Sequence, residues 1–362
     1  MLRDTARGFL DANAPVTNLR ANRDAGRGYD DGLWREMAQM GWAGVLVGED
    51  HGGSGMGHRA AGILSEEMGK TLVASPFISS AVIAATALRD TASARLPAIA
   101  AGEATYALAV DEGRKHNPTA TAMTASAQGN AFRLSGRKTL VAEGTSASRL
   151  LVLARTSGAA GDDMGLTLFD INADRAGVVR TGSNSIDARD FANLDFDTVD
   201  ATGEDVVGEV DNGLAALAPA LNAGRAALAA ELSGLSAGIF GATTGYLKER
   251  KQFGITIGAF QALQHRAAHL WSEIEVTTSA IANAGRVLDR NACSSDLAVS
   301  LAKARATATA RLAVMEGVQM HGGIGMTDEY DAGFYMKRAR VGAEWLGDYG
   351  YHAARVCALR GL

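Results

Sequence analysis

Two short segments in the last third of the chain carry side chains that suit the binding of a phosphate group. The first begins at Arg250 and contains Gln252, and the second has Gln319 followed by Gly322 and Gly323. Arginine presents a planar fork of donors that matches phosphate oxygens, and a glutamine amide donates or accepts a hydrogen bond. Paired glycines let a backbone approach a ligand without interference from Cβ. A glycine pair after a helix is also a common helix cap, so each segment alone is a weak signal.

The chain divides into three regions with different residue patterns, and these patterns predict the elements that position the two segments. Residues 1-104 show apolar and charged residues at helical spacing, as in YDDGLWREMAQMGWAGV. Residues 105-211 contain short β-branched runs, separated by turn residues every 8 to 12 positions or so, which is typical of an antiparallel sandwich or barrel. Residues 212-362 return to long helices that are apolar around much of their circumference. Such helices predict a bundle buried by neighbours or by another subunit, the alternative being a monomeric helical protein with an inserted β domain.

The composition excludes several classes of protein. The chain has 362 residues, 47% of them apolar, and a net charge of -5, so it offers no concentrated positive surface for nucleic acid or an anionic membrane. Its two cysteines, Cys293 and Cys357, have neither metal-ligand nor redox spacing. The N-terminus lacks the apolar core of a signal peptide, and no apolar run approaches the roughly 20 residues that span a bilayer. We therefore expect a globular cytoplasmic protein that binds neither nucleic acid nor membrane.

Five segments resemble, in order and at compatible spacing, the motifs of the acyl-CoA dehydrogenase family. They are MGWAGVLVGEDHGGSGM, LPAIAAGEA, GEVDNGLAALAPALNAGR, ERKQFGITIGAFQALQHRAA and VQMHGGIGMTDEYDAGFYMKRARV, and the resemblance covers nearly the whole chain. It implies an α+β fold with an N-terminal helical domain, a middle antiparallel β domain and a C-terminal four-helix bundle. It also implies FAD shared between two subunits, with the flavin ring in a cleft of one and the adenosine diphosphate end held largely by the neighbour's bundle.

The part of the FAD site that a subunit gives to its neighbour is present in this sequence. In the family, a carboxylate base takes the proton α to the thioester of an acyl-CoA while the flavin accepts the β hydrogen as hydride. The resemblance implies cofactor-binding roles for Arg250, Gln252, Phe253, Phe260, Gln261, Gln319, Gly322 and Gly323. The aromatic residues and Gln261 match positions around the adenosine end. A surface arginine with two buried bundle glutamines is the alternative interpretation.

The part of the site that a subunit keeps for its own flavin ring is absent. Where the family has Thr/Ser-Glu-Pro and then Gly-Ser-Asp, this chain reads VDEGRKHNP, with Asp111, Glu112 and Gly113 and no Gly-Ser-Asp. A gapless match from Gly136 places the run Leu140-Val141-Ala142 where the family often has Trp-Ile-Thr. Small aliphatic side chains provide neither the aromatic wall nor the hydroxyl.

The catalytic base is missing as well. The family's Tyr-Glu-Gly-Thr falls on the run WLGD, which puts Leu346 at the position of the glutamate. Some relatives carry the base before the arginine of the LNAGR motif instead, but Gly224 stands there. Glu344 and Asp348 flank the gap, and either carboxylate would serve only if the turn were reorganised. Asp348 also suits a helix terminus or turn.

The simplest single cause for these losses is a division of labour between two chains. The hypothesis is a subunit of a heteromeric acyl-CoA dehydrogenase, a heterotetramer in known cases, that lacks the catalytic Glu and completes the FAD site of a catalytic paralogue. The partners implied are that paralogue, an acyl-CoA, bulky as in steroid side-chain degradation, and an electron-transfer flavoprotein. Two alternatives stay open: an active homo-oligomer with Asp348 or Glu344 as base, and a flavin-free scaffolding or acyl-CoA-binding protein. The lone histidines, His321 among them, are expected to be loop or packed side chains rather than metal ligands.

Overall fold

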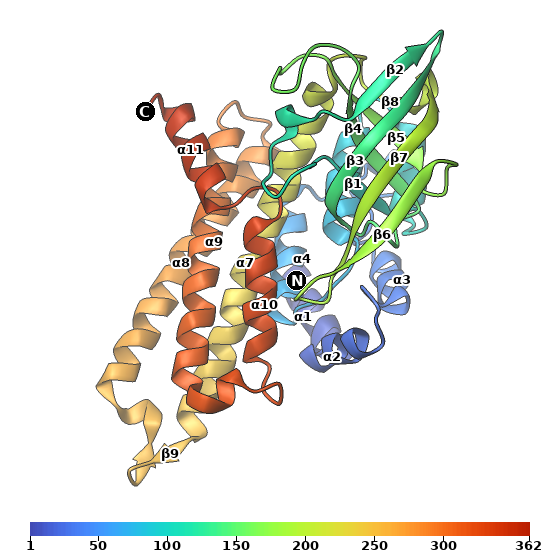
Figure 1. Cartoon of the computed structure of the whole chain (residues 1–362). Coiled ribbons are helices and arrows are strands. Elements are labelled where there is room, and N and C mark those ends of the chain that lie inside the picture. The colour runs from blue at the N-terminus through green and yellow to red at the C-terminus, as the bar shows by residue number, and fades with distance from the viewer. The chain divides into compact units, whose positions relative to one another are not determined.

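The computed structural model describes residues 1–362 and divides them into two compact units. The helical unit comprises Met1–Ala21, His58–Val73 and Arg225–Leu362, and the sheet unit comprises Asn22–Gly57 and Ala74–Gly224. The main helices of the helical unit are labelled in Figure 1: α1 (Leu2–Asn13), α2 (Val16–Asp24), α4 (His58–Lys70), α7 (Gly213–Glu249), α8 (Gln261–Asp289), α9 (Ser295–His321), α10 (Ala332–Glu344) and α11 (Tyr349–Arg360). α2 and α7 each extend into the sheet unit.

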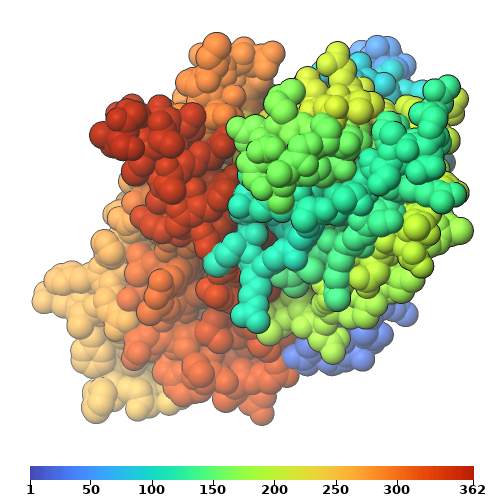
Figure 2. All heavy atoms as spheres, turned by 45° about the horizontal axis from the view of Figure 1, so that its top comes forward, coloured from blue at the N-terminus to red at the C-terminus, as the bar shows by residue number.

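Small residues set the packing of the helical unit. A Cβ at Gly234 of α7 would lie 1.8 Å from the carbonyl oxygen of Glu66 in α4, so the two helices approach at a distance that only glycine permits. Arg338 of α10 is buried in the same core, where it donates to the Val73 carbonyl at 3.2 Å and pairs with Glu231 at 3.6 Å. In contrast to the buried Arg338, α11 and the C-terminus (dark red) lie at the surface of the molecule (Figure 2).

The central helix α7 corrects one expectation from the sequence. By length and composition alone it could cross a bilayer, because one 18-residue window reaches a mean hydropathy of 1.2. However, 72% of that window is buried inside the protein. Alanine raises its hydropathy, and its alanines and glycines are the small residues that allow neighbouring helices to pack closely, as expected for a helix buried on several sides.

A single eight-stranded sheet forms the centre of the sheet unit. The strands are β1 (Tyr106–Ala109), β2 (Thr124–Gln128), β3 (Ala131–Ala142), β4 (Arg149–Arg155), β5 (Leu166–Asn172), β6 (Val178–Asn184), β7 (Asp190–Thr202) and β8 (Val206–Val207). They follow the order β6-β7-β3-β2-β4-β5-β8, with β1 also paired to β4. Most pairs are antiparallel, as predicted, but β1 runs parallel to β4 and the sheet is therefore mixed. A parallel pair requires a long connection, and residues 110–148 provide it.

The remaining helices of the sheet unit include a buried π-helix. They are α3 (Asp31–Gln39), η1 (Glu49–His51), η2 (Phe77–Ala84), α5 (Ala85–Leu88), η3 (Ser93–Arg95), α6 (Leu96–Ala100), η4 (Pro118–Ala120) and η5 (Gly203–Asp205). The π-helix is η2, whose Ser80 hydroxyl accepts a hydrogen bond from the Tyr106 amide at 2.8 Å. The α+β fold expected from the sequence is confirmed, whereas the domain boundaries at 104 and 211 stay predictions.

Candidate cofactor site and the turn at Leu346

The eight residues predicted to bind the cofactor lie at one end of the helical bundle. α7 ends at Glu249, a short hairpin follows, and α8 begins at Gln261. α8 then runs to the opposite end, and α9 returns to finish at His321 (Figure 1). The hairpin, made of β9 (Lys251–Gln252) and β10 (Ile255–Thr256), and the glycine loop after α9 therefore lie at the same end of antiparallel helices.

The hairpin projects an aromatic side chain from its tip. Gln252 pairs with Ile255, which leaves Phe253 and Gly254 as a two-residue loop with φ of 54° and 81°. Two positive φ values are those of a type I′ turn, in which a residue other than Gly, Asn or Asp is strained. Phe253 is 91% exposed and meets Phe260 edge-on, with ring centroids 6.1 Å apart. A strained and exposed aromatic residue indicates a contact with something outside this chain.

Arg250 and Gln319 are free to bind a ligand at this end. The backbone of Arg250 is fixed on both sides, since its amide donates to Tyr246 and its carbonyl accepts from Ile257. The side chains of Arg250 and Gln319 are exposed and make no hydrogen bond or ion pair within the chain. Five guanidinium donors and one amide group are thus available to the phosphates of a dinucleotide.

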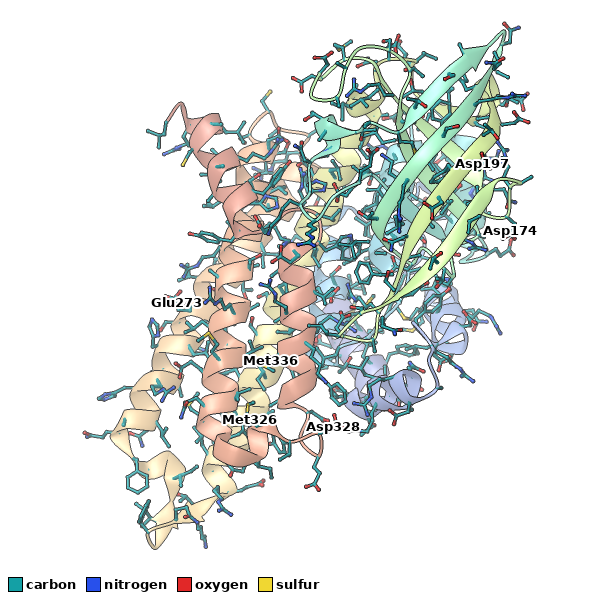
Figure 3. All side chains as sticks on the ribbon, viewed as in Figure 1. Asp174, Asp197, Glu273, Met326, Asp328 and Met336 are labelled. Atoms are coloured by element: carbon teal, nitrogen blue, oxygen red, sulfur yellow. The ribbon has the colours of Figure 1, made fainter.

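The loop after α9 keeps open space beside its backbone. Gly322 has a φ of 67°, and a Cβ at Gly322 or at Gly323 would meet no atom within 4 Å. Met326, at the end of the loop η7 (Gly322–Met326), is 71% exposed and lies at the same end of the bundle as β9 (Figure 3). The loop therefore fits the close approach of a cofactor, as its sequence predicts.

His321 anchors this loop, consistent with a packed side chain. Its Nδ1 lies 2.7 Å from the Gly317 carbonyl, and its ring packs against Tyr246 and Tyr330 at centroid distances of 4.7 and 4.5 Å. Burial lowers the pKa of His321 below its ordinary value, so the ring stays neutral at pH 7 and Nδ1 carries the donated proton. The ring thereby ties the glycine loop to the last turn of α7.

Leu346 lies in a turn that is held from both sides by buried cations. The residue is 4% exposed with a φ of 58°, and its carbonyl accepts from Arg225 Nε and lies near His352 Nε2, both at 3.2 Å. Lys303, fully buried in α9, donates to the carbonyls of Gly342, Ala343 and Gly347 at 3.0 to 3.3 Å. These carbonyls belong to the end of α10 and the following turn, where helices leave their acceptors unpaired.

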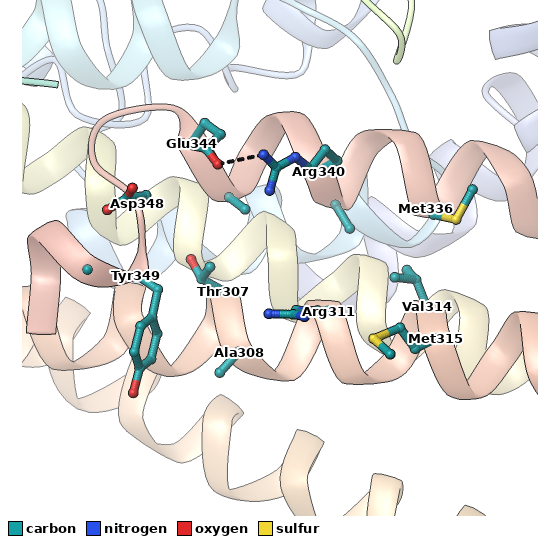
Figure 4. Close-up of a pocket in the computed structure, with 13 residues that line it drawn as sticks. Thr307, Ala308, Arg311, Val314, Met315, Met336, Arg340, Glu344, Asp348 and Tyr349 are labelled. Carbon is teal, nitrogen blue, oxygen red and sulfur yellow. Dashed lines mark ion pairs between the residues drawn. The ribbon is translucent and has the colours of Figure 1, made fainter. Parts of the chain in front are cut away.

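The two flanking carboxylates have structural partners. Glu344 pairs with Arg340 at 3.1 Å, and Asp348 caps α11 by accepting from the Tyr351 amide at 2.8 Å. Both line a groove between α9, α10 and the start of α11, whereas Leu346 is not among the residues that line it (Figure 4). Glu344 is thus an ion-pair partner and Asp348 a helix cap, and both carboxylates lie apart from the buried Leu346 side chain.

In the sheet unit, the acidic loop that contains Asp111 and Glu112 is held by hydrogen bonds within the protein. Glu112 accepts from the amides of Ala122 and Met123 at 2.8 and 2.9 Å, and pairs with Lys138 at 2.7 Å. Burial lowers the pKa of Lys138 to about 8, a shift that the Glu112 charge opposes. Leu140 is 54% exposed with a φ of 52°, and the pairing of β3 with β7 is irregular at this point. These groups stabilise the loop and offer a flavin ring neither a free hydroxyl nor an aromatic wall.

The contacts of Arg225 in α7 and Lys303 in α9 with the turn were not predicted from the sequence. The available signal is a lysine flanked by small residues: Lys303 lies between Ala302 and Ala304 in SLAKARATA, two positions before Arg305. A lysine in phase with a buried helix face must find acceptors inside the protein.

Lys303 is expected to make the free energy of unfolding depend on pH. Burial, to which the charge of Arg225 adds, lowers the pKa of Lys303 from 10.5 to about 7. Between these values the unfolded chain binds more protons than the folded one, so the free energy of unfolding rises with pH. We expect wild type to gain about 1.4 kcal/mol per pH unit relative to Lys303→Met between pH 8 and 9. Urea denaturation of both proteins from pH 6 to 9 measures this, and parallel profiles would contradict it.

Comparison with known proteins assigns the family. Residues 1–103 match the acyl-CoA dehydrogenase N-terminal domain, and residues 211–358 match the acyl-CoA dehydrogenase C-terminal domain. The acyl-CoA dehydrogenase IpdE2 of Mycobacterium tuberculosis (strain ATCC 25618 / H37Rv) is 32% identical over 350 residues, which cover 96% of this chain and 92% of the relative. The chain therefore belongs to the acyl-CoA dehydrogenase family of oxidoreductases.

Two solved structures extend the comparison. A variant of the Tcur3481-Tcur3483 steroid ACAD superposes with a TM-score of 0.89 at 31% identity and covers 99% of this chain and 96% of that one. Butyryl-CoA dehydrogenase from Megasphaera elsdenii reaches a TM-score of 0.93 at 21% identity, with 100% and 97% covered, which is a likeness of fold. Members of the family bind FAD, and the open bundle end has residues that fit such a dinucleotide.

Proposed function

We propose that this chain is the non-catalytic subunit of a heteromeric acyl-CoA dehydrogenase. It provides Arg250, Gln252, Gln319 and the Gly322-Gly323 loop to FAD, whose flavin ring and catalytic base belong to a second, catalytic chain. FAD supplies the redox chemistry when bound, and the residues of this chain hold its adenosine diphosphate end. The assembly is expected to be a heterotetramer with one FAD for every two chains.

The observation that carries the proposal is the contrast between the two halves of the site. At the bundle end, Arg250 and Gln319 are exposed, make no hydrogen bond or ion pair within the chain, and lie at the same end as an open glycine loop. In the sheet unit, the acidic loop is occupied by Lys138 and two backbone amides. A carboxylate base must reach the proton it removes, and the buried Leu346 has no acidic group to offer.

The substrate of the assembly is an acyl-CoA, and we propose a bulky one such as the side-chain thioester of a steroid. The support is the 31% identity to the Tcur3481-Tcur3483 steroid ACAD over 99% of this chain. Electrons would pass to an electron-transfer flavoprotein, and the assembly would work in the cytoplasm. In this chain, the cleft that holds the flavin ring in catalytic members of the family would contain no cofactor. That cleft would leave room for a large acyl group.

Flavin content tests the proposal. The chain is purified alone and co-expressed with each acyl-CoA dehydrogenase-like chain encoded beside it, and FAD is quantified by absorbance after denaturation. We expect no flavin, or insoluble protein, for the chain alone and about one FAD per pair of chains with one partner. One FAD per chain in the absence of a partner, bleached by an acyl-CoA, would instead favour an active homo-oligomer with Asp348 or Glu344 as its base. A complex that remains colourless would favour a flavin-free scaffold.

A further inference from the structure

A groove along the outside of the bundle continues the face that carries Gln319. It has a volume of about 630 Å³ and is lined by Thr307, Ala308, Arg311, Val314, Met315, Met336, Ala339, Arg340, Ala343, Glu344, Asp348, Tyr349 and Gly350. Figure 4 shows these side chains on α9, on α10 and at the start of α11. Apart from Thr307 and four charged side chains, the lining consists of alanines, methionines, a valine, a tyrosine and a glycine.

The groove and the predicted cofactor contact share one stripe of α9. Gln319, Met315, Arg311 and Ala308 are spaced by four, four and three residues, so they lie on one side of the helix. All four are exposed, and Arg311 lies about 12 Å along the helix from Gln319. A protein surface that meets FAD at Gln319 and continues along α9 would therefore also cover Met315 and Arg311.

The exposed apolar residues of the groove suit a protein contact. Met315, Met336 and Tyr349 are 59%, 40% and 54% exposed. Methionines adapt their shape to a packed surface, and tyrosine is enriched at the centres of interfaces. Such residues on three helices around one groove are more than the scattered apolar exposure of an ordinary surface.

One charge in the groove lacks a partner. Arg340 pairs with Glu344 at 3.1 Å, and Asp348 caps α11. Arg311, the fourth charged side chain of the lining, makes no hydrogen bond or ion pair within the chain. An apolar surface that covered Arg311 without offering it an acceptor would bury an unpaired cation, which is strongly unfavourable. The surface that fits the groove therefore presents a carboxylate among apolar side chains.

We propose that the α9–α10 groove receives the catalytic partner chain and that Arg311 selects it by pairing with a carboxylate on that chain. This rests on the proposed function, because the stripe is continuous with the cofactor contact at Gln319. It adds a specificity-determining residue that lies outside the cofactor site. A second copy of this chain is the competing occupant.

Charge reversal at Arg311 tests the proposal in the co-expressed complex. For Arg311→Gln we expect a rise in the dissociation constant of about 10-fold or more, and a larger rise for Arg311→Glu, because truncating one partner of a desolvated charge pair costs several kcal/mol. Size-exclusion chromatography with light scattering and titration of the two purified chains measure this. Arg290→Glu is the matched control, since Arg290 is exposed at the far end of α8. Circular dichroism verifies that each variant is folded.

The outcomes separate this inference from the proposed function. If wild type forms a flavin-containing complex and Arg311→Glu forms it equally well, the groove assignment is wrong and the proposed function survives. If Arg311→Glu disrupts only self-association of this chain, the groove binds a second copy and the assignment of the partner is overturned. If wild type forms no complex with a paralogue, both fail. Loss of the complex with Arg311→Glu, together with its recovery when one partner Asp or Glu is changed to Arg, supports the pair.

Discussion

Replacing Arg250 with alanine in the two-chain complex is expected to remove most of its FAD. A hydrogen-bonded pair between a guanidinium and a phosphate contributes about 2 to 3 kcal/mol, so the dissociation constant of FAD should rise on the order of 100-fold. Activity at limiting FAD should fall in parallel and recover when FAD is added in excess. Fluorescence titration of the deflavinated complex with FAD measures the change.

Two matched variants make the Arg250 result specific. Arg250→Lys keeps the charge but loses the planar fork, so we expect an intermediate affinity. Arg290→Ala removes an exposed arginine from the opposite end of α8 and should leave FAD binding unchanged. Wild-type affinity in Arg250→Ala would remove Arg250 from the site, and an equal loss in Arg290→Ala would reveal a general charge effect.

Local patterns in the sequence were sufficient for the parts of the site that are built from short segments. The hairpin with Phe253 and the loop with Gly322 are each encoded in a few consecutive residues, and both are exposed at helix ends, as glycine-rich connections should be. The change from helices to strands and back is also local, because the spacing of apolar residues differs between the two.

Contacts between distant segments could not be predicted in the same way. The pairing of Lys138 with Glu112 joins residues 26 positions apart, and the contact of Lys303 with Gly347 joins residues 44 positions apart. The parallel pairing of β1 with β4 likewise depends on how a long connection folds back. Such contacts follow from tertiary packing, which the spacing of a single segment does not encode. They also decide the chemistry, since they determine which carboxylates remain free.

Restoring a carboxylate at the family position is expected to yield no catalyst. Leu346→Glu places an acid in a residue that is 4% exposed and lies between two buried cations, Arg225 and Lys303, whose donors already bind main-chain carbonyls. We expect the free energy of unfolding to fall by about 2 to 4 kcal/mol, because the carboxylate would lose its hydration while the donors of both cations stay bound to main-chain carbonyls. We also expect no bleaching of flavin when an acyl-CoA is added to this chain alone.

Leu346→Gln separates the two reasons for that result. Glutamine has nearly the same shape as glutamate but no charge, so it should destabilise less, and the excess loss in Leu346→Glu should diminish as pH falls and the carboxylate is protonated. Inactivity, by contrast, should be independent of pH, because the loop around Glu112 still provides no contacts for a flavin ring. If Leu346→Glu without a partner bound FAD and oxidised an acyl-CoA, the sheet unit would be competent after all. The division of the site between two chains would then be wrong. The replacement of the catalytic glutamate by Leu346 would be the one change that inactivates an otherwise complete enzyme.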